Sequence, residues 1–288
     1  MDNTANAFEA LADASDDSRW AFGTGFEDPL SGVDTSVPSG VDGSSLAAYC
    51  LILGDDALVF SHRLQQWCTN APELEDEVAL ANIGLDLLGQ ARLLFARAGK
   101  AEGTGRSEDD FAFLRPENEF RNVRLAELER GDFGQLIAVL LVFSTWRLAL
   151  FQRLTDSPDP VLAAIAAKGV KELAYHRDYA AQWAVRLGDG TEYSHERMQA
   201  GLESVWPYVE ELFTPHEIER QAGVSASREE FDEVLARVFD AAKLTTPEVP
   251  SRAGVAGRMG RDGIHTEAMG YLLAELQSVA RALPGATW

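Results

Sequence analysis

The sequence is poor in cysteine and has no long apolar run. Its two cysteines, Cys50 and Cys68, fall in one helical pattern, where 18 residues at about 1.5 Å each place them about 27 Å apart, too far for a disulfide. No segment approaches the roughly 18 uninterrupted apolar residues that span a bilayer, and the chain does not open on a signal-peptide pattern. We therefore expect two reduced thiols in a cytoplasmic protein that does not enter a membrane.

Basic residues are scarce as well. Lys and Arg number 25 against 46 Asp and Glu, which gives a formal net charge of -21. Nucleic acids and anionic membrane surfaces would repel such a chain, so neither is an expected partner. The charge favours a basic or neutral protein partner, and it would equally serve solubility alone.

Strand-like alternation is missing, and helical periodicity follows an irregular start. Residues 1–42 are rich in Asp, Ser, Gly and Thr without apolar periodicity, which predicts an acidic flexible tail. The rest, 43–288, is expected to form a single helical domain. Its predicted helices cover 46–68, 73–97, 132–154, 160–187, 194–213, 227–244 and 266–283, the last of them capped by Thr266.

The first four of these helices are long, and the connection from the second to the third, 99–131, is the longest between them. That arrangement predicts an all-α fold, a ferritin-like four-helix bundle with a long crossover and additional C-terminal helices. The third helix is apolar nearly all round, so we expect it at the centre.

Bundles of this class often hold two iron ions between their four helices. Two helices each give a Glu, and the other two each give Glu-x-x-His, whose spacing brings both ligands onto one inward face. In this sequence the fourth long helix carries His176, but Leu173 stands in its Glu slot. The second helix carries Gln90 in place of the His and Leu87 in place of the Glu.

The other two helices supply few ligands. The third has Ser144 at its polar centre and no acid from 133 to 154, and the first has only Asp55 and Asp56, nearer its start than its middle. We expect no metal and no catalytic residue in this chain. The positions that we interpret as those of a lost metal site are Asp86, Leu87, Gln90, Ser144, Glu172, Leu173 and His176.

Two interpretations of the surviving polar residues stay open. In the first, Glu172 and His176 are held near Asp86 and Gln90 by hydrogen bonds, as a polar plug in an apolar core. In the second, Asp86, Glu172 and His176 bind a single metal ion. Metal analysis of the purified chain would separate the two.

Five blocks of the sequence point to a known family. They include LGDDALVFSHRLQQW from residue 53, FRNVRLAELERGDF from residue 120 and GRDGIHTEAMGYLLAEL from residue 260. Over residues 45–288 the chain resembles the C-subunit family of the phenylacetyl-CoA 1,2-epoxidase complex. The five blocks are 53–94, 120–133, 162–176, 186–199 and 260–288.

The resemblance implies a ferritin-like subunit that has no di-iron site and no other cofactor of its own. Such a subunit pairs with a homologous catalytic subunit that carries di-iron and binds phenylacetyl-CoA. The complex contains further subunits and takes electrons from a reductase with flavin and iron-sulfur groups. It converts the aromatic ring to a 1,2-epoxide with O2, in aerobic phenylacetate degradation.

An arginine-rich segment of the crossover is at odds with the acidic whole. By the resemblance, Phe120, Arg121 and Asn122 are placed to contact the coenzyme A part of the substrate. The phosphates of coenzyme A could pair with the arginines, and its adenine could stack on Phe120. The alternative is that the arginines at 115, 121 and 124 pair with the nearby glutamates at 117, 119 and 127.

Three functions are therefore weighed. The leading one is a non-catalytic scaffold for a catalytic partner, because leucine at 87 and 173 is incompatible with a working di-iron oxygenase. The second is a self-sufficient di-metal oxygenase or oxidase with an unusual ligand set. The third, a ferritin-like storage protein, would require metal uptake.

Overall fold

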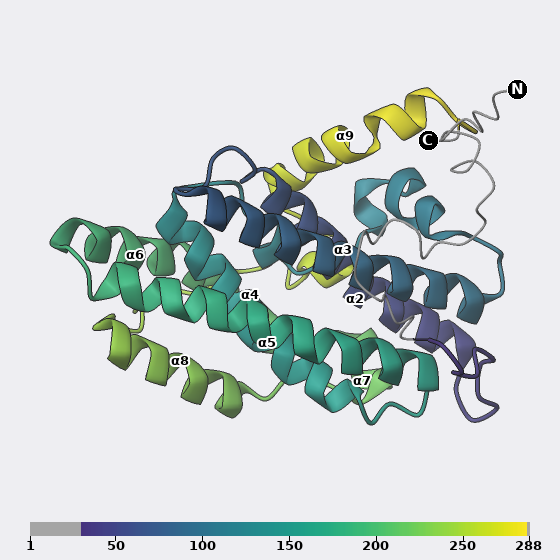
Figure 1. The fold of residues 1–288 in the computed structure, drawn as a ribbon. Coiled ribbons are helices and arrows are strands. Elements are labelled where there is room, and N and C mark those ends of the chain that lie inside the picture. Colours follow the sequence, from purple (N-terminus) through teal and green to yellow (C-terminus); the bar gives the residue numbers. More distant parts are fainter. Residues whose placement is uncertain (1–29, 287–288) are drawn as a thin grey trace, which may run out of the picture.

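The computed structural model describes residues 30–286, and its main body is a bundle of four long helices (Figure 1). α2 lies along α3, α4 lies along α5, and the connection between α3 and α4 crosses the bundle. No strand occurs within the described range. The predicted all-α, ferritin-like fold is confirmed. The four helices are α2 (Gly43–Gln65), α3 (Leu74–Glu102), α4 (Phe133–Leu154) and α5 (Pro160–Gly188).

Aspartates fix where three of these helices begin. The side chain of Asp42 accepts a hydrogen bond from the amide of Ser45 at 2.8 Å, which caps α2. Asp132 and Asp159 cap α4 and α5 in the same way, each through the amide three residues on. These bonds satisfy amides that have no partner within their own helix.

Four shorter helices follow the bundle: α6 (Glu192–Val205), α7 (Glu217–Ala222), α8 (Arg228–Ala242) and α9 (Glu267–Ala282). The prediction of one helix over 194–213 is wrong. Pro207 has no amide hydrogen, so α6 ends at Val205 and two 3-10 turns continue to Phe213. Thr266 precedes α9 as predicted, but its side chain makes no cap and donates to Glu127 instead.

The core is centred on α4, as expected. Every residue from 136 to 151 is buried. By length and composition α2, α3 and α4 could each cross a membrane, although none of them contains 18 uninterrupted apolar residues. Of the most apolar stretch, 89% is buried inside the protein for α4, 72% for α2 and 44% for α3. The apolar surface of α4 is therefore used within the bundle, whereas much of that of α3 is not.

The segment before α2 divides into two parts. Residues 1–29 of the expected tail lie outside the described residues. Residues 30–42 pack on the core through Val33, Val37 and Val41. The guanidinium of Arg97 in α3 donates to the carbonyl of Thr35 at 2.6 Å and also pairs with Asp159 at the start of α5. The part from 30 to 42 is thus attached to the bundle.

Candidate functional site

The polar residues expected at a lost metal site meet between α3 and α5. His176 Nε2 lies 3.0 Å from Oδ2 of Asp86, and Gln90 Nε2 donates to Oε2 of Glu172 at 2.9 Å. Because a carboxylate only accepts, Nε2 of His176 carries the proton. The hydrogen bonds that the first interpretation predicted are confirmed.

The leucines and the serine offer nothing to a metal ion. Leu87 and Leu173 are fully buried in the hydrophobic core. Ser144 is also buried, and its hydroxyl donates to the carbonyl of Leu140 in its own helix at 2.6 Å. Glu172 is occupied by Lys168 as well as Gln90. The slots that would bridge two metal ions therefore hold apolar or internally bonded side chains.

A buried arginine that the sequence reasoning did not single out reaches this region from α4. Arg147 is 0% exposed, and its Nε donates to Oε1 of Gln90 at 3.1 Å. Nη2 donates to the carbonyl of Leu53, also at 3.1 Å, and Nη1 lies 3.9 Å from Oδ2 of Asp56. Burial lowers the pKa of Arg147 to about 10, so the guanidinium stays charged at neutral pH.

A metal ion does not fit this arrangement. A guanidinium bound to Gln90 places a fixed positive charge in the low-dielectric interior, where it would repel a second cation. The single-metal interpretation needs Glu172, whose oxygens are taken by Lys168 and Gln90. In the part of the chain from 30 to 286, no group of three or more His, Cys, Asp or Glu side chains could hold a metal ion.

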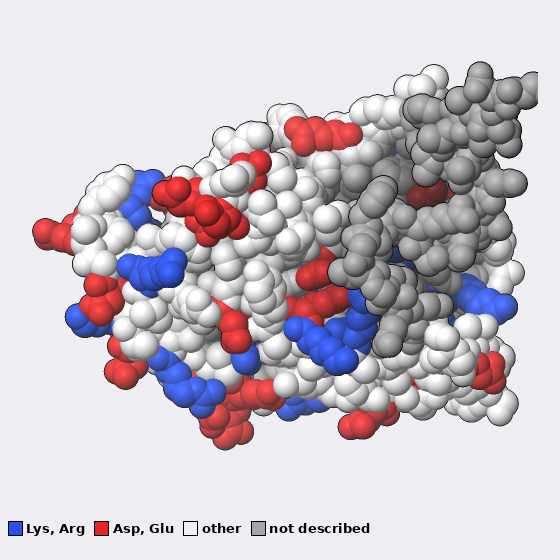
Figure 2. All heavy atoms as spheres, in the orientation of Figure 1, with Lys and Arg blue, Asp and Glu red and all other residues white. Residues whose placement is uncertain are grey.

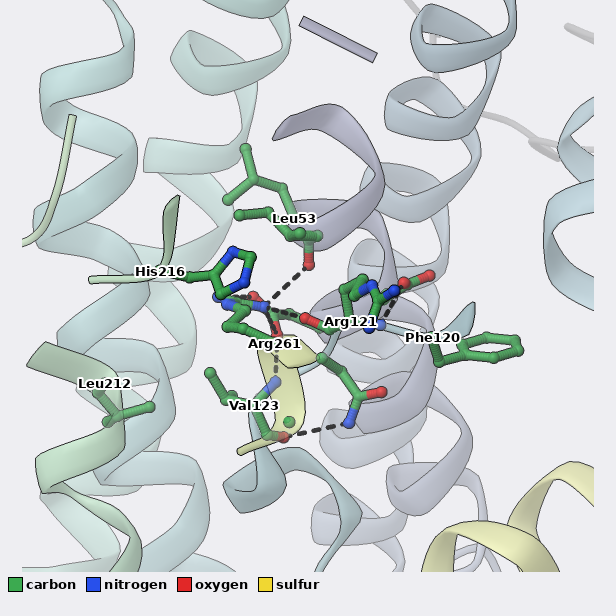
Figure 3. A network of polar contacts seen from close by, with 12 residues as sticks. Leu53, Phe120, Arg121, Val123, Leu212, His216 and Arg261 are labelled. Carbon is green, nitrogen blue, oxygen red and sulfur yellow. Dashed lines mark hydrogen bonds and ion pairs between the residues drawn. The ribbon is translucent and has the colours of Figure 1, made fainter. Parts of the chain in front are cut away.

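Asp56 connects Arg147 to a second polar network, which includes Arg261 and Val123. Figure 3 shows Arg261 and Val123 in this network. The two oxygens of Asp56 accept from Nη1 and Nη2 of Arg261 at 2.8 and 2.9 Å, and Oδ1 also accepts from the amide of Val123 at 2.8 Å. Burial raises the pKa of Asp56, against the pull of Arg261 and Arg147. Burial also opposes the charge on Arg261, but Asp56 and Glu219 beside it raise its pKa.

The neighbouring Asp55 holds residues 120–122, the segment expected to contact coenzyme A. It pairs with Arg115 and accepts from the amide of Arg121 at 2.8 Å. The guanidinium of Arg115 lies 4.2 Å from the ring centroid of Phe120, which is 0% exposed. An adenine could stack on Phe120 only if this segment opened. Asn122 is equally buried, so of the three predicted coenzyme A contacts only Arg121 is partly exposed.

Glu127 ties the end of the crossover to the beginning of α9. One oxygen accepts from His265 Nδ1 at 2.6 Å and from the side-chain nitrogen Nδ2 of Asn122 at 2.9 Å. The other accepts from the amide and the hydroxyl of Thr266, each at 2.7 Å. His265 Nε2 lies 3.1 Å from the carbonyl of Phe120. Since both acceptors lack hydrogens, the geometry calls for a doubly protonated imidazolium.

The alternative, a pairing of the crossover arginines with nearby glutamates, is wrong for Arg115 and Arg124. Arg115 pairs with Asp55 of α2, and Arg124 pairs with Glu211, whose other oxygen accepts from the amide of Gly260 at 3.1 Å. Burial raises the pKa of Glu211, while Arg124 acts against that. The crossover is therefore held by acids from distant parts of the chain.

One signal could have identified these residues from the sequence. Asp55, Asp56 and Arg147 are charges within helices that are otherwise apolar on almost every side. Asp, Glu, Lys and Arg are almost never fully buried unless paired. Such charges therefore predict buried partners, although not which ones.

Comparison with known proteins gives the family. The family model described as phenylacetic acid catabolic protein matches residues 34–288. The C subunit of the 1,2-phenylacetyl-CoA epoxidase of Escherichia coli (strain K12) is 43% identical over 253 residues, which cover 85% of this chain and 100% of that protein. With its all-helical bundle, the chain thus belongs to the family of phenylacetic acid catabolic proteins.

Proposed function

We propose that this chain is a non-catalytic structural subunit of a phenylacetyl-CoA 1,2-epoxidase, which stabilises a homologous di-iron catalytic subunit. The observation that carries the proposal is the buried Arg147, hydrogen-bonded to Gln90 at the place where a metal centre would need ligands. Leu87 and Leu173 support it, because neither can bind or bridge iron. The 43% identity to the C subunit of a phenylacetyl-CoA epoxidase supports the assignment of this chain to an epoxidase complex.

The proposal assigns no cofactor to this chain. Di-iron belongs to the catalytic subunit, and flavin and iron-sulfur groups belong to the reductase that supplies electrons. The complex would work in the cytoplasm. The ring epoxidation itself would take place in the partner, while this chain holds the partner in its active shape.

We further propose that this chain contacts the coenzyme A part of the substrate. The contact rests on Arg121, whose amide is held by Asp55 while its side chain is partly exposed. Arg121→Glu in the assembled complex should raise the apparent KM for phenylacetyl-CoA. An unchanged KM would remove this contact and leave the structural role untouched.

Co-expression with the homologous di-iron subunit tests the structural role. We expect the two chains to co-elute in size-exclusion chromatography, with the iron found in the partner. Separate elution would contradict the proposal. O2-dependent turnover by the isolated chain, with stoichiometric iron, would favour the self-sufficient oxygenase instead.

A further inference from the structure

Helices α5 and α8 lie side by side and leave a groove of about 530 Å³ between them (Figure 1). Residues 177–186 of α5 and 234–241 of α8 line it. The two helices approach closely just beyond this stretch, where a Cβ on Gly188 would lie 2.3 Å from the carbonyl oxygen of Ala242. The groove is thus closed at one end by backbone, and its volume is of the size of a small-molecule site.

The floor of the groove is apolar. Ala181, Val185 and Val238 are half-buried, and they pack on the core with one side while they line the groove with the other. Val234 and Ala241 extend the floor along α8. A flat organic group placed on this floor would remove apolar surface from water, which favours its binding.

Three arginines surround the floor. Arg177 and Arg186 belong to α5 and Arg237 to α8, and Asp178 is the one acid among the described residues of the lining. Figure 2 shows basic side chains over this part of α5 and α8. The lining is therefore positive, although the chain as a whole has a net charge of -21. Such a local excess of positive charge attracts anions.

The same arginines are poorly paired within the protein. Arg177 lies 3.9 Å from Asp178, which is too far for a hydrogen bond. Within residues 30–286, Arg186 and Arg237 form no ion pair and donate no hydrogen bond. The guanidinium of Arg186 lies instead over the ring of Trp183, 5.1 Å from its centroid. This contact orders the guanidinium and leaves its hydrogens available.

Exposed arginines on other faces do find acids. Arg106, Arg153 and Arg220 each pair with a carboxylate, at distances between 2.6 and 3.0 Å. The chain has 46 acids, so a shortage of carboxylates does not explain the free arginines of the groove. Like charges held around one groove repel one another, and an anion bound between them would relieve that repulsion.

We propose that this groove, the arginine groove below, binds a phosphorylated organic anion of the size of a nucleoside diphosphate. The phosphates would pair with the arginines, because a guanidinium donates two parallel hydrogen bonds to phosphate oxygens. The organic part would lie on the apolar floor. A diphosphate would also balance the excess positive charge of the lining. No described residue of the crossover lines the groove, so this site is separate from the contact proposed for Arg121.

Calorimetry on the full-length chain tests the proposal, with ADP as the probe, in low salt and without divalent cations. We expect ADP to bind more tightly than pyrophosphate, which cannot use the floor, and much more tightly than adenosine, which has no charge. Added salt should weaken the binding of ADP. A Kd above about 1 mM for ADP, or equal Kd values for ADP and pyrophosphate, would overturn the proposal.

Two variants locate the binding. Arg186→Gln and Arg237→Gln should each raise the Kd for ADP by about tenfold, since each removes hydrogen bonds between charged groups. Both side chains are exposed, so the melting temperature should hardly change. Arg220→Gln is the matched control, because Arg220 is an exposed arginine of α7 that does not line the groove. It should bind ADP as the wild type does.

Two further outcomes would refute the arginine groove as a small-molecule site. If the two groove variants bind ADP as tightly as the wild type, ADP binds elsewhere. If a polyglutamate peptide binds more tightly than ADP, and loses that binding in the same variants, the groove is a surface for an acidic polypeptide.

Discussion

Arg147 and Glu172 are joined through the single side-chain amide of Gln90. Its oxygen accepts from Nε of Arg147 at 3.1 Å, and its nitrogen donates to Glu172 at 2.9 Å. A histidine in this slot could not do both in the same way, because a neutral imidazole ring points its donor and acceptor in fixed, diverging directions. The glutamine therefore links a buried cation on α4 to a carboxylate on α5.

Replacing Arg147 by methionine should destabilise the chain strongly. The variant leaves Asp56, Gln90 and the carbonyl of Leu53 with one partner fewer in a buried site. We expect a loss of about 3–5 kcal/mol in the free energy of unfolding, measured by urea denaturation. Arg153→Met is the control. Arg153 pairs with Glu230 at the surface, with both side chains 42% exposed, so its loss should cost less than about 1 kcal/mol. Equal effects of the two variants would contradict the role given to Arg147.

Glu127→Gln should loosen α9. The buried carboxylate accepts four hydrogen bonds, two of them from Thr266 at the beginning of the helix, and an amide supplies only one oxygen for them. We expect a loss of about 3 kcal/mol in unfolding free energy and faster hydrogen exchange in residues 267–282. Glu129→Gln, at an exposed position in the same segment, should leave both unchanged. Unaltered exchange in α9 of the Glu127 variant would show that this anchor is unimportant.

Deprotonation of His265 should lower the free energy of unfolding as the pH rises above 6.5. Burial opposes the charge on this imidazole, but Glu127 and the carbonyl of Phe120 raise its pKa above 6.5. Its contribution is therefore complete below the unfolded pKa and is lost as pH rises through the folded pKa. Burial lowers the pKa of His62, so that group destabilises the fold only on the acid side of 6.5. Urea unfolding from pH 6.5 upward should show a downward slope in the wild type that His265→Gln lacks; identical slopes would refute the imidazolium.

Arg97→Met should release residues 30–42. Both Arg97 and Asp159 are 1% exposed at their side chains, and Arg97 donates to the carbonyls of Thr35 and Ser36. We expect new cleavage sites between 30 and 42 in limited proteolysis, together with a loss of about 3 kcal/mol or more in stability. A digestion pattern like that of the wild type would show that the valines of this segment hold it without the arginine.

The helices could be predicted because their causes are local. Apolar periodicity located α2 to α5, and Asp132 and Asp159 marked the beginnings of α4 and α5. The spacing of Leu87 from Gln90 and of Leu173 from His176 identified the facing segments of α3 and α5, and hence their hydrogen bonds. Pro207 was overlooked, and with it the end of α6, and the local signals that begin and end the short helix α7 were overlooked as well.

The second polar network could not be predicted because its partners are remote. Arg261 reaches Asp56 across 205 positions of the chain, and His265 reaches Glu127 across 138. Local reasoning instead paired the crossover arginines with the nearest glutamates. The suggested stacking of an adenine on Phe120 likewise left out the burial of this ring and the arginine above it.

Asp56 contacts the crossover, the connector before α9 and the central helix α4. Its carboxylate accepts hydrogen bonds from Val123 in the crossover and from Arg261 in the connector before α9. The same carboxylate also faces the guanidinium of Arg147 at the centre of the bundle. Force applied to the crossover would reach Arg147 through one short, stiff side chain. The crossover is therefore coupled to the centre of the bundle through Asp56, and a displacement of one would disturb the other.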